Sequence, residues 1–258
     1  MISYFFSKKY WLPIMLLTQT AIVRQNKDSF LGSLWGLIQP FTQVIIISYF
    51  FGFLLKLPKD QLIMNLVGAL PFWLFIVNSL NIATNSIIAR SGIIKKVVIS
   101  RTIFPFSDSL VQVYTLIYSF VAMYIAFIIL YPEKFSIWII FLPILVLPLI
   151  ICVVSVSIAF AFLTPYIRDI PQLLNLILNI VYWTIPIVYP YSIVPESKRI
   201  FFEINPVFIV IRPMQHLVIE GNMPDVFMII KSVIVAIITS FVSYLGYRCL
   251  SKNVIYYV

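Results

Sequence analysis

The sequence predicts an all-α integral membrane protein with six transmembrane helices, an N-terminal interfacial helix, a cytoplasmic coupling helix and short re-entrant helices on the outer side. Of its 258 residues, 62% are hydrophobic and only 10% are charged, and the mean hydropathy is +1.03. A soluble domain is about half apolar and about a quarter charged. This chain has too few polar side chains to cover a water-exposed surface, so lipid must surround most of it.

Residues 1–30 are predicted to form the interfacial helix. Lys8 and Lys9 precede an apolar run that Pro13 and Gln19 interrupt. The run has no small-x-small cleavage site, and further basic residues follow it. A helix that lies in the membrane interface therefore explains it better than a signal peptide does.

Six apolar segments follow, each close to or above the length of about 20 residues that a helix needs to cross a hydrocarbon core about 30 Å thick. They cover residues 34–55, 62–89, 103–130, 137–163, 171–189 and 226–245. Neither an internal repeat nor a Gly/Ser-rich linker divides the chain, so residues 1–258 are predicted to form a single transmembrane domain.

The connector at 191–225 holds short apolar blocks between Pro195, Pro206, Pro213 and Pro224. None of these blocks is long enough to span a bilayer. We expect them to be outer-side helices that dip partway into the membrane, where protein or water covers their backbone groups.

The connector at 90–101 reads RSGIIKKVVISR and mixes basic with apolar residues. It is either a loop that binds lipid headgroups or a short cytoplasmic helix that contacts another protein, and its composition suits both. Under the second interpretation, the contact residues are Arg90, Ile93, Ile94, Lys95, Lys96 and Val97.

Basic residues set the expected orientation. The net charge of +9 would suggest nucleic acid as a partner of a soluble protein, but here most of the charge lies in short connectors. With the N-terminus in the cytoplasm, 11 of the 18 Lys and Arg residues lie on the cytoplasmic side. Eight of these 11 are in the N-terminal arm and in residues 90–101, as the positive-inside rule requires. Both termini are then cytoplasmic, the protein contacts anionic membrane lipids, and nucleic acid is not expected to bind.

Catalytic motifs are missing from the sequence. It has no GxxxxGK[ST] phosphate loop, no HExxH and no GxSxG, and its single histidine, His216, cannot build a multi-histidine metal site. We therefore expect no metal, no cofactor and no ATPase activity on this chain, and a transport subunit rather than an enzyme.

Two spans carry uncharged polar stripes. At about 100° per residue, the polar side chains of each fall on one arc of about 120°. Such a stripe either bonds neighbouring helices or lines a path for a hydroxyl-rich substrate, since amides donate and accept while rings pack against sugar C–H surfaces. The candidates are Trp35, Gln39, Thr42, Gln43 and Tyr49 in the first span, Gln172, Asn175, Asn179, Tyr182 and Trp183 in the fifth, and Tyr189 beside Pro186.

Other polar residues within spans have packing explanations. Asn78, Asn81 and Asn85 form a shorter stripe on the second span, for which helix packing is the preferred interpretation. Asp108 follows Pro105 closely, so a favourable position in the first turn of the third helix explains it. Pairing with Arg101 or with a partner subunit is the alternative.

Several motifs together resemble the transmembrane subunit of ATP-binding-cassette exporters for cell-surface polysaccharides, the group of O-antigen, teichoic-acid and capsule permeases. The chain departs from the family pattern at one position. The family often has Arg about ten residues after the Asn of its NP motif, and this chain has Gln215 there, with Arg212 three residues before it. The motifs, in order, are LGSLW at 31–35 with Pro40, VGALP at 67–71, Asn85 with Ser86, IIKKV at 93–97, Arg101, Pro105, Arg168 with Asp169, IPIVYP at 185–190, and Asn205 with Pro206.

The resemblance implies a homodimeric permease in the bacterial cytoplasmic (inner) membrane, bound to two copies of a separate ATPase subunit that holds ATP and Mg. It implies that the coupling segment and the N-terminal helix contact this ATPase and that the first and fifth spans line the path. The implied cargo is a polysaccharide on undecaprenyl diphosphate, moved from the inner to the outer leaflet. Four cations either attract that diphosphate or contact anionic lipids: Arg24, Lys27, Arg101 and Arg168.

Other classes of function remain as alternatives. An exporter of drugs or small lipids would have a more apolar path. A motor-free channel or secondary transporter would act without an ATPase, but the spans lack the acids and histidines that couple protons. A membrane glycosyltransferase or acyltransferase would need an acid, a base or a metal site.

Overall fold

The computed structural model describes residues 8–27, 34–96 and 99–257, and every regular element within them is a helix. The helices of eight or more residues are α2 (Lys8–Lys27), α3 (Trp35–Leu55), α4 (Lys59–Ser86), α6 (Ile103–Leu130), α8 (Leu147–Leu163), α9 (Ile170–Thr184), α10 (Glu196–Glu203), α11 (Pro206–Glu220) and α12 (Val226–Leu250). Short elements join them: η2 (Ile88–Arg90), α5 (Ser91–Ile94), η3 (Pro132–Lys134), η4 (Ile137–Phe141), α7 (Leu142–Leu145), η5 (Tyr191–Ile193) and η6 (Val254–Tyr256).

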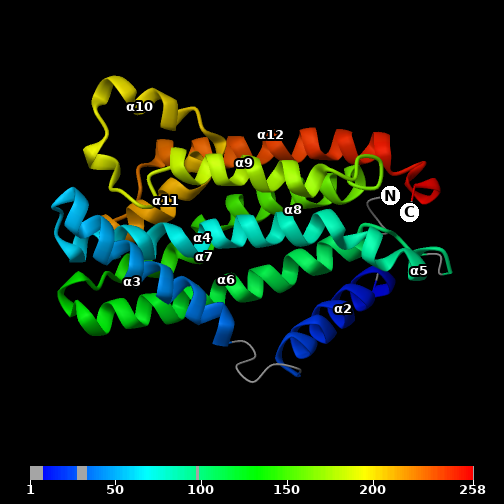
Figure 1. The fold of residues 1–258 in the computed structure, drawn as a ribbon, viewed down its shortest axis with the longest axis horizontal. Coiled ribbons are helices and arrows are strands. Elements are labelled where there is room, and N and C mark those ends of the chain that lie inside the picture. The colour runs from blue at the N-terminus through cyan, green and yellow to red at the C-terminus, as the bar shows by residue number, and fades with distance from the viewer. Residues whose placement is uncertain (1–7, 28–33, 97–98, 258) are drawn as a thin grey trace.

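Helix α4 is the centre of the bundle. It contacts α3, α6, α8, α9 and α11, and side chains around most of its circumference are buried. Gly68 allows the closest of these approaches, because a Cβ atom there would lie only 3.3 Å from Cβ of Val218 on α11. The long helices α4, α6, α8, α9 and α12 run side by side along the bundle (Figure 1).

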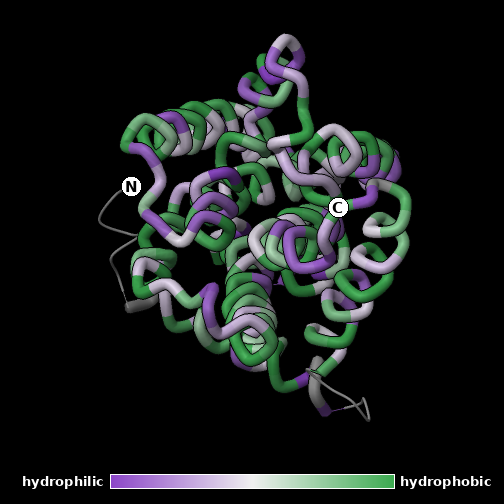
Figure 2. The backbone as a smooth tube through the Cα atoms, turned by 90° about the vertical axis from the view of Figure 1, so that its left-hand side faces the viewer, coloured by the Kyte–Doolittle hydropathy of each residue, from purple (hydrophilic) through white to green (hydrophobic). Residues whose placement is uncertain are grey.

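The surface of the bundle is as apolar as its interior. Large hydrophobic side chains such as Phe53, Ile129 and Phe241 are exposed, and hydrophobic positions occupy both the outer and the inner turns of the bundle in Figure 2. A surface of this kind suits lipid rather than water. Among the described residues, five helical stretches are long and apolar enough to cross a membrane: Trp35–Leu54, Lys59–Ser86, Ile103–Leu130, Ile137–Leu163 and Val226–Leu250.

The predicted class of an all-helical, multi-span membrane protein is confirmed, but the fifth predicted span is shorter than expected. We expected residues 171–189, whereas α9 covers Ile170–Thr184, only 15 residues. The helix ends there because Ile185 precedes Pro186, and a residue before proline avoids the helical region. Ile185 accordingly has extended torsion angles, φ −107° and ψ 141°. A count of six spans stays a prediction.

The two ends of the bundle differ (Figure 1). One end carries α5, the first turn of α2 and the C-terminal element η6. The other carries α10 and α11, which correspond to the predicted segment 191–225. Asn205 caps α11, because its Oδ1 accepts a hydrogen bond of 3.0 Å from the Val207 amide. Gly221, at φ +68°, ends it.

Helix α2 confirms a helix within the predicted N-terminal segment. Tyr10 and Ile14 are buried against Ile103 on α6, and the Tyr10 hydroxyl lies 3.0 Å from Oγ1 of Thr102. Its placement in the membrane interface stays a prediction.

Candidate functional site

The two polar stripes face a common groove. Helices α3 and α9 form its walls and α4 forms its floor, and its volume is about 300 Å³. We name it the α3–α9 groove. Its lining residues are Gln39, Gln43 and Ile47 from α3, Trp73, Leu74 and Val77 from α4, and Asn175, Leu178, Asn179 and Tyr182 from α9.

The amides in the groove retain hydrogen-bonding capacity. Oε1 of Gln43 is buried and has no partner among the residues that the structure describes. Nδ2 of Asn179 donates to the Asn175 carbonyl over 2.9 Å, and its side-chain oxygen accepts no hydrogen bond from the described residues. A hydroxyl of a ligand can donate to the Asn179 oxygen, whereas the Gln43 side chain must first turn its oxygen toward the groove.

Aromatic surface lies beside these amides. The rings of Trp73 and Tyr182 are 5.6 Å apart and tilted by 42°. Trp73 is buried in α4, where the sequence analysis did not select it. The ring of Tyr182 packs on this indole at the floor of the groove.

The remaining predicted path residues lie outside this lining. Trp35 and Thr42 occupy an adjoining shallow surface of α3 together with Gln39 and Gln43. The Tyr49 ring packs on Phe50. The other three differ in their surroundings: Gln172 and Trp183 are exposed on α9, and Tyr189 is half-buried in the segment after α9.

The three asparagines of the α4 stripe also lie in different surroundings. Asn78 lines a small cavity of about 30 Å³ between α3, α4 and α6. Oδ1 of Asn81 is buried and has no hydrogen-bond partner in the described part of the chain. Asn85 is exposed near the end of the helix, where its Nδ2 donates to Oγ1 of Thr84 over 3.5 Å.

A buried pair of amides holds the chain where it leaves α9. Gln215 on α11 donates through Nε2 to Oδ1 of Asn65 over 2.9 Å and to the Pro186 carbonyl over 2.8 Å. Nδ2 of Asn65 donates in turn to the carbonyls of Ile187 at 2.6 Å and Tyr189 at 3.2 Å. We name Asn65 and Gln215 the amide clamp. It satisfies carbonyl groups of residues 185–190 that a helix would otherwise have paired.

The sequence analysis noted Gln215 only as a departure from a family pattern and did not select Asn65. Both side chains are 1% exposed. The available signal was an asparagine in an apolar segment and a proline that ends a predicted span. The distance of 150 residues between the partners hid their pairing.

Asp108 pairs with Arg90 rather than with Arg101, the partner named as an alternative from the sequence. Nη1 and Nη2 of Arg90 donate to the two carboxylate oxygens over 2.7 and 2.6 Å, and Nη1 also donates to Oγ of Ser86 over 2.9 Å. The Arg90 guanidinium is thus engaged within the chain, and its contact with an ATPase stays a prediction. Asp108 lies in the second turn of α6, beyond the first turn predicted for it.

The predicted coupling helix is short, because α5 makes a single turn over Ser91–Ile94. Ile93, Lys95 and Lys96 are exposed. Ile94 is buried among Phe104, Phe162 and Val254, so it anchors the segment and is unavailable to a partner. Val97 lies outside the described residues.

The four candidate phosphate-binding cations do not converge on one site. Arg24 and Lys27 are exposed in the last turn of α2, which Figure 1 shows apart from the turn before α9. Arg101 donates through Nη1 to the Ser251 carbonyl over 3.0 Å. Arg168 is exposed in that turn before α9, and it makes no hydrogen bond or ion pair to the described residues.

Comparisons with known proteins agree with this architecture. Residues 13–219 match the family model of the ABC-2 type transporter. Among curated proteins, two O-antigen export system permease proteins RfbA from Klebsiella pneumoniae are 24% and 23% identical to this chain over 209 and 211 residues. The first match covers 81% of this chain and 80% of the relative, and the second covers 81% of each. The RfbA permease of Myxococcus xanthus is 20% identical over 216 residues, 82% of each chain.

Proposed function

The chain belongs to the ABC-2 type transporter family, and on this premise we propose that it is the permease subunit of an ATP-driven exporter of undecaprenyl-diphosphate-linked polysaccharide. In this proposal, two copies of the chain join two copies of a separate ATPase subunit, which holds ATP and Mg. The glycan moves from the cytoplasmic to the outer side of a bacterial inner membrane. The names of the relatives support the class of cargo, since all three are O-antigen export permeases.

The observation that carries the proposal is the α3–α9 groove. Its walls combine amides that have spare acceptors with the Tyr182 ring, and none of the described residues that line it is Asp, Glu, Lys or Arg. Uncharged amides and rings bind hydroxyl-rich chains without holding one register, because each bond is replaced as the next sugar arrives. A drug or small lipid would instead require mainly apolar walls.

The proposed path is tested by filling the groove. Asn179→Trp places a bulky indole on its wall, so we expect surface glycan to be nearly abolished while the permease still co-purifies with its ATPase. Ile180→Trp is the matched control, because Ile180 is exposed on the same helix and does not line the groove. Both variants are compared by immunoblot of surface glycan at equal permease level. Normal export with Asn179→Trp would contradict the proposal.

We propose that the α5 end of the bundle faces the ATPase, because the exposed Lys95 and Lys96 lie there and the positive-inside rule puts such residues in the cytoplasm. The exposed Ile93 beside them supplies apolar contact area. Ile93→Asp is expected to abolish co-purification of the ATPase. Ile82→Asp, at an exposed position of α4, is the control and is expected to retain co-purification of the ATPase.

Of the four candidate phosphate-binding cations, Arg168 is exposed at this end and makes no hydrogen bond or ion pair to the described residues. We propose that Arg168→Gln weakens stimulation of the assembled ATPase by undecaprenyl diphosphate, since arginine pairs with phosphate oxygens. Arg248→Gln is the matched control at an exposed position in the last turn of α12. Unchanged stimulation in Arg168→Gln would remove it from the site.

A further inference from the structure

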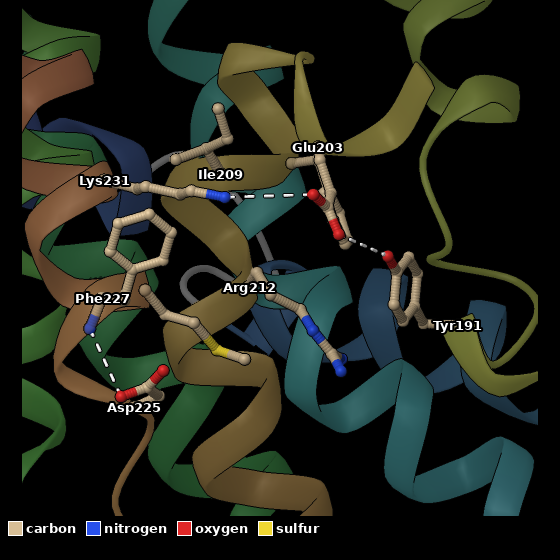
Figure 3. A pocket seen from close by; sticks show the side chains of 9 residues that line it. Tyr191, Glu203, Ile209, Arg212, Asp225, Phe227 and Lys231 are labelled. Atoms are coloured by element: carbon tan, nitrogen blue, oxygen red, sulfur yellow. Dashed lines mark hydrogen bonds and ion pairs between the residues drawn. The ribbon is translucent and has the colours of Figure 1, made fainter. Parts of the chain in front are cut away.

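A second cavity lies at the opposite end of the bundle from α5, between α10, α11 and the start of α12. Its volume is about 320 Å³, at the lower end of the range of about 300–1,000 Å³ that ligand pockets occupy. We name it the end pocket. Figure 3 shows side chains from η5, α10, α11 and the start of α12 that line it: Tyr191, Glu203, Arg212, Asp225, Phe227 and Lys231.

Its charges are balanced and its hydrogen-bonding groups are only partly used. Nζ of Lys231 lies 3.9 Å from Oε2 of Glu203, too far for a hydrogen bond. Nη1 of Arg212 donates to Oε1 of Gln215 over 3.3 Å, and its Nη2 is 4.0 Å from Glu220. Within the described residues the Asp225 carboxylate accepts one long hydrogen bond, 3.5 Å from the Phe227 amide. Donors and acceptors are thus both free for a ligand.

Balanced charge decides against a phosphate. A phosphate group approaching Arg212 and Lys231 would also meet the carboxylates of Glu203 and Asp225, which repel it. Sugar hydroxyls meet no such conflict, because they donate to the carboxylates and accept from the cations.

Apolar surface completes the chemistry. Phe227 is 60% exposed at the rim, and the Tyr191 ring is fixed between Phe208, with ring centres 5.3 Å apart, and the Arg212 guanidinium, 4.8 Å from the ring centre. Aromatic rings beside paired donors and acceptors suit the alternating C–H and O–H surface of a pyranose.

We propose that the end pocket binds one or two sugar units of the exported glycan as they leave the α3–α9 groove, an inference that rests on the proposed function. One segment of the chain runs from the first site to the second. Tyr182 of the groove and Tyr191 of the pocket bracket the segment 185–190, and the amide clamp holds that segment. Gln215 of the clamp also accepts the hydrogen bond from Arg212.

Photocrosslinking in living cells tests this proposal. The photoreactive amino acid p-benzoylphenylalanine replaces Phe227, which is conservative in shape, within the complete transporter, and the cell's own surface polysaccharide is the probe. The control position is Val226, 67% exposed and outside the pocket lining. A third position, Gln39, reports on the groove. Captured glycan is recognised as a ladder of slower permease bands that periodate oxidation collapses.

The expected result is a glycan ladder from positions 227 and 39 and none from 226. Arg212→Gln should remove the ladder at 227 and retain that at 39, whereas Arg199→Gln should retain both. Arg199 is the matched control because its guanidinium also lies over the Tyr191 ring, 5.5 Å from the centre, yet does not line the cavity. Co-purification with the ATPase shows that each variant is assembled.

The other outcomes separate the two proposals. A ladder at 39 without one at 227 overturns the end-pocket inference and leaves the proposed function intact. Capture of phospholipid alone at 227 also overturns it, because the pocket is then a lipid site. Equal ladders at 226 and 227 show contact without a pocket and overturn it as well. No ladder at either 39 or 227 contradicts both proposals.

Discussion

Amide side chains occupy two regions of the bundle and are used in opposite ways. In the α3–α9 groove, Gln43 keeps a buried oxygen without a partner in the described residues, and Asn175 and Asn179 are exposed. In the amide clamp, Asn65 and Gln215 are 1% exposed, their amide nitrogens donate to backbone carbonyls, and Nε2 of Gln215 also donates to Oδ1 of Asn65.

The difference shows that polarity within an apolar bundle does not by itself identify a path. A buried amide that meets its hydrogen-bonding needs within the protein stabilises one geometry. An amide left without a partner costs free energy in the resting structure, and a passing substrate can recover that cost. The following predictions test this division, beginning with the largest expected effect.

Gln215→Arg should destabilise the permease most. The new guanidinium would be buried beside Arg212, and an uncompensated buried charge costs on the order of 3–5 kcal/mol. Thermal unfolding of the purified permease in detergent measures the loss. Gln172→Arg, at an exposed position of α9, is the control and should unfold near the wild-type temperature. Wild-type stability in Gln215→Arg would contradict this prediction. It would show that the clamp accommodates the arginine that the polysaccharide exporters resembled by this sequence often have at this position.

Asn65→Leu should have the next largest effect. It leaves the Ile187 and Tyr189 carbonyls without their donor, and each unsatisfied buried group costs about 1–3 kcal/mol. The same unfolding measurement applies, with the groove variant Asn179→Leu as the matched amide-to-leucine control. Equal losses in the two variants would remove the distinction between clamp and groove.

Gln43→Leu should separate stability from transport. It deletes a buried oxygen that has no described partner, so stability should not fall and should rise by up to about 1–3 kcal/mol, the cost of leaving such a group unsatisfied. Surface glycan should nevertheless decrease, since the groove loses an acceptor. Export at the wild-type level would place Gln43 among packing residues, and a large loss of stability would reveal a hydrogen bond formed in the folded state.

The smallest effect concerns pH near the clamp. Burial lowers the pKa of His216 from the ordinary 6.5, with Arg212 acting in the same direction, while Glu220, 3.0 Å away, and Asp225 oppose the shift. As the pH falls through about 6.5, the unfolded chain binds a proton that the folded chain resists, so stability decreases on acidification and is regained above that pH. His216→Gln should lose less of its unfolding temperature between pH 7.5 and pH 5.5 than wild type. An identical loss would contradict this assignment.

Much of the fold could be predicted because apolar length is a local property. The third predicted span matches α6 at both ends, 103 and 130. The stripes on α3 and α9 followed from helical periodicity, and the resemblance implied that both line a path. Their lining of one groove is seen in the structure, and a role in transport is proposed.

Pairings between distant segments could not be predicted. Arg90 was expected to face a partner protein, yet Asp108 holds it inside, because a buried carboxylate requires a cation. Ile94 was expected at the same surface but fills a cluster with Phe104 and Val254. Both residues belong to a segment with the composition of a surface connector. Only the residues that pack against them show that the two side chains point into the protein.

The sequence by itself determined that the chain is helical and surrounded by lipid, since composition and the length of apolar runs decide both. It also determined where α9 ends, because Pro186 disfavours a helical conformation at Ile185. Only the tertiary structure decided which amides are satisfied and which are left open. Hydrogen bonds form between groups that packing brings within about 3 Å, and Asn65 and Gln215 meet across 150 residues of chain.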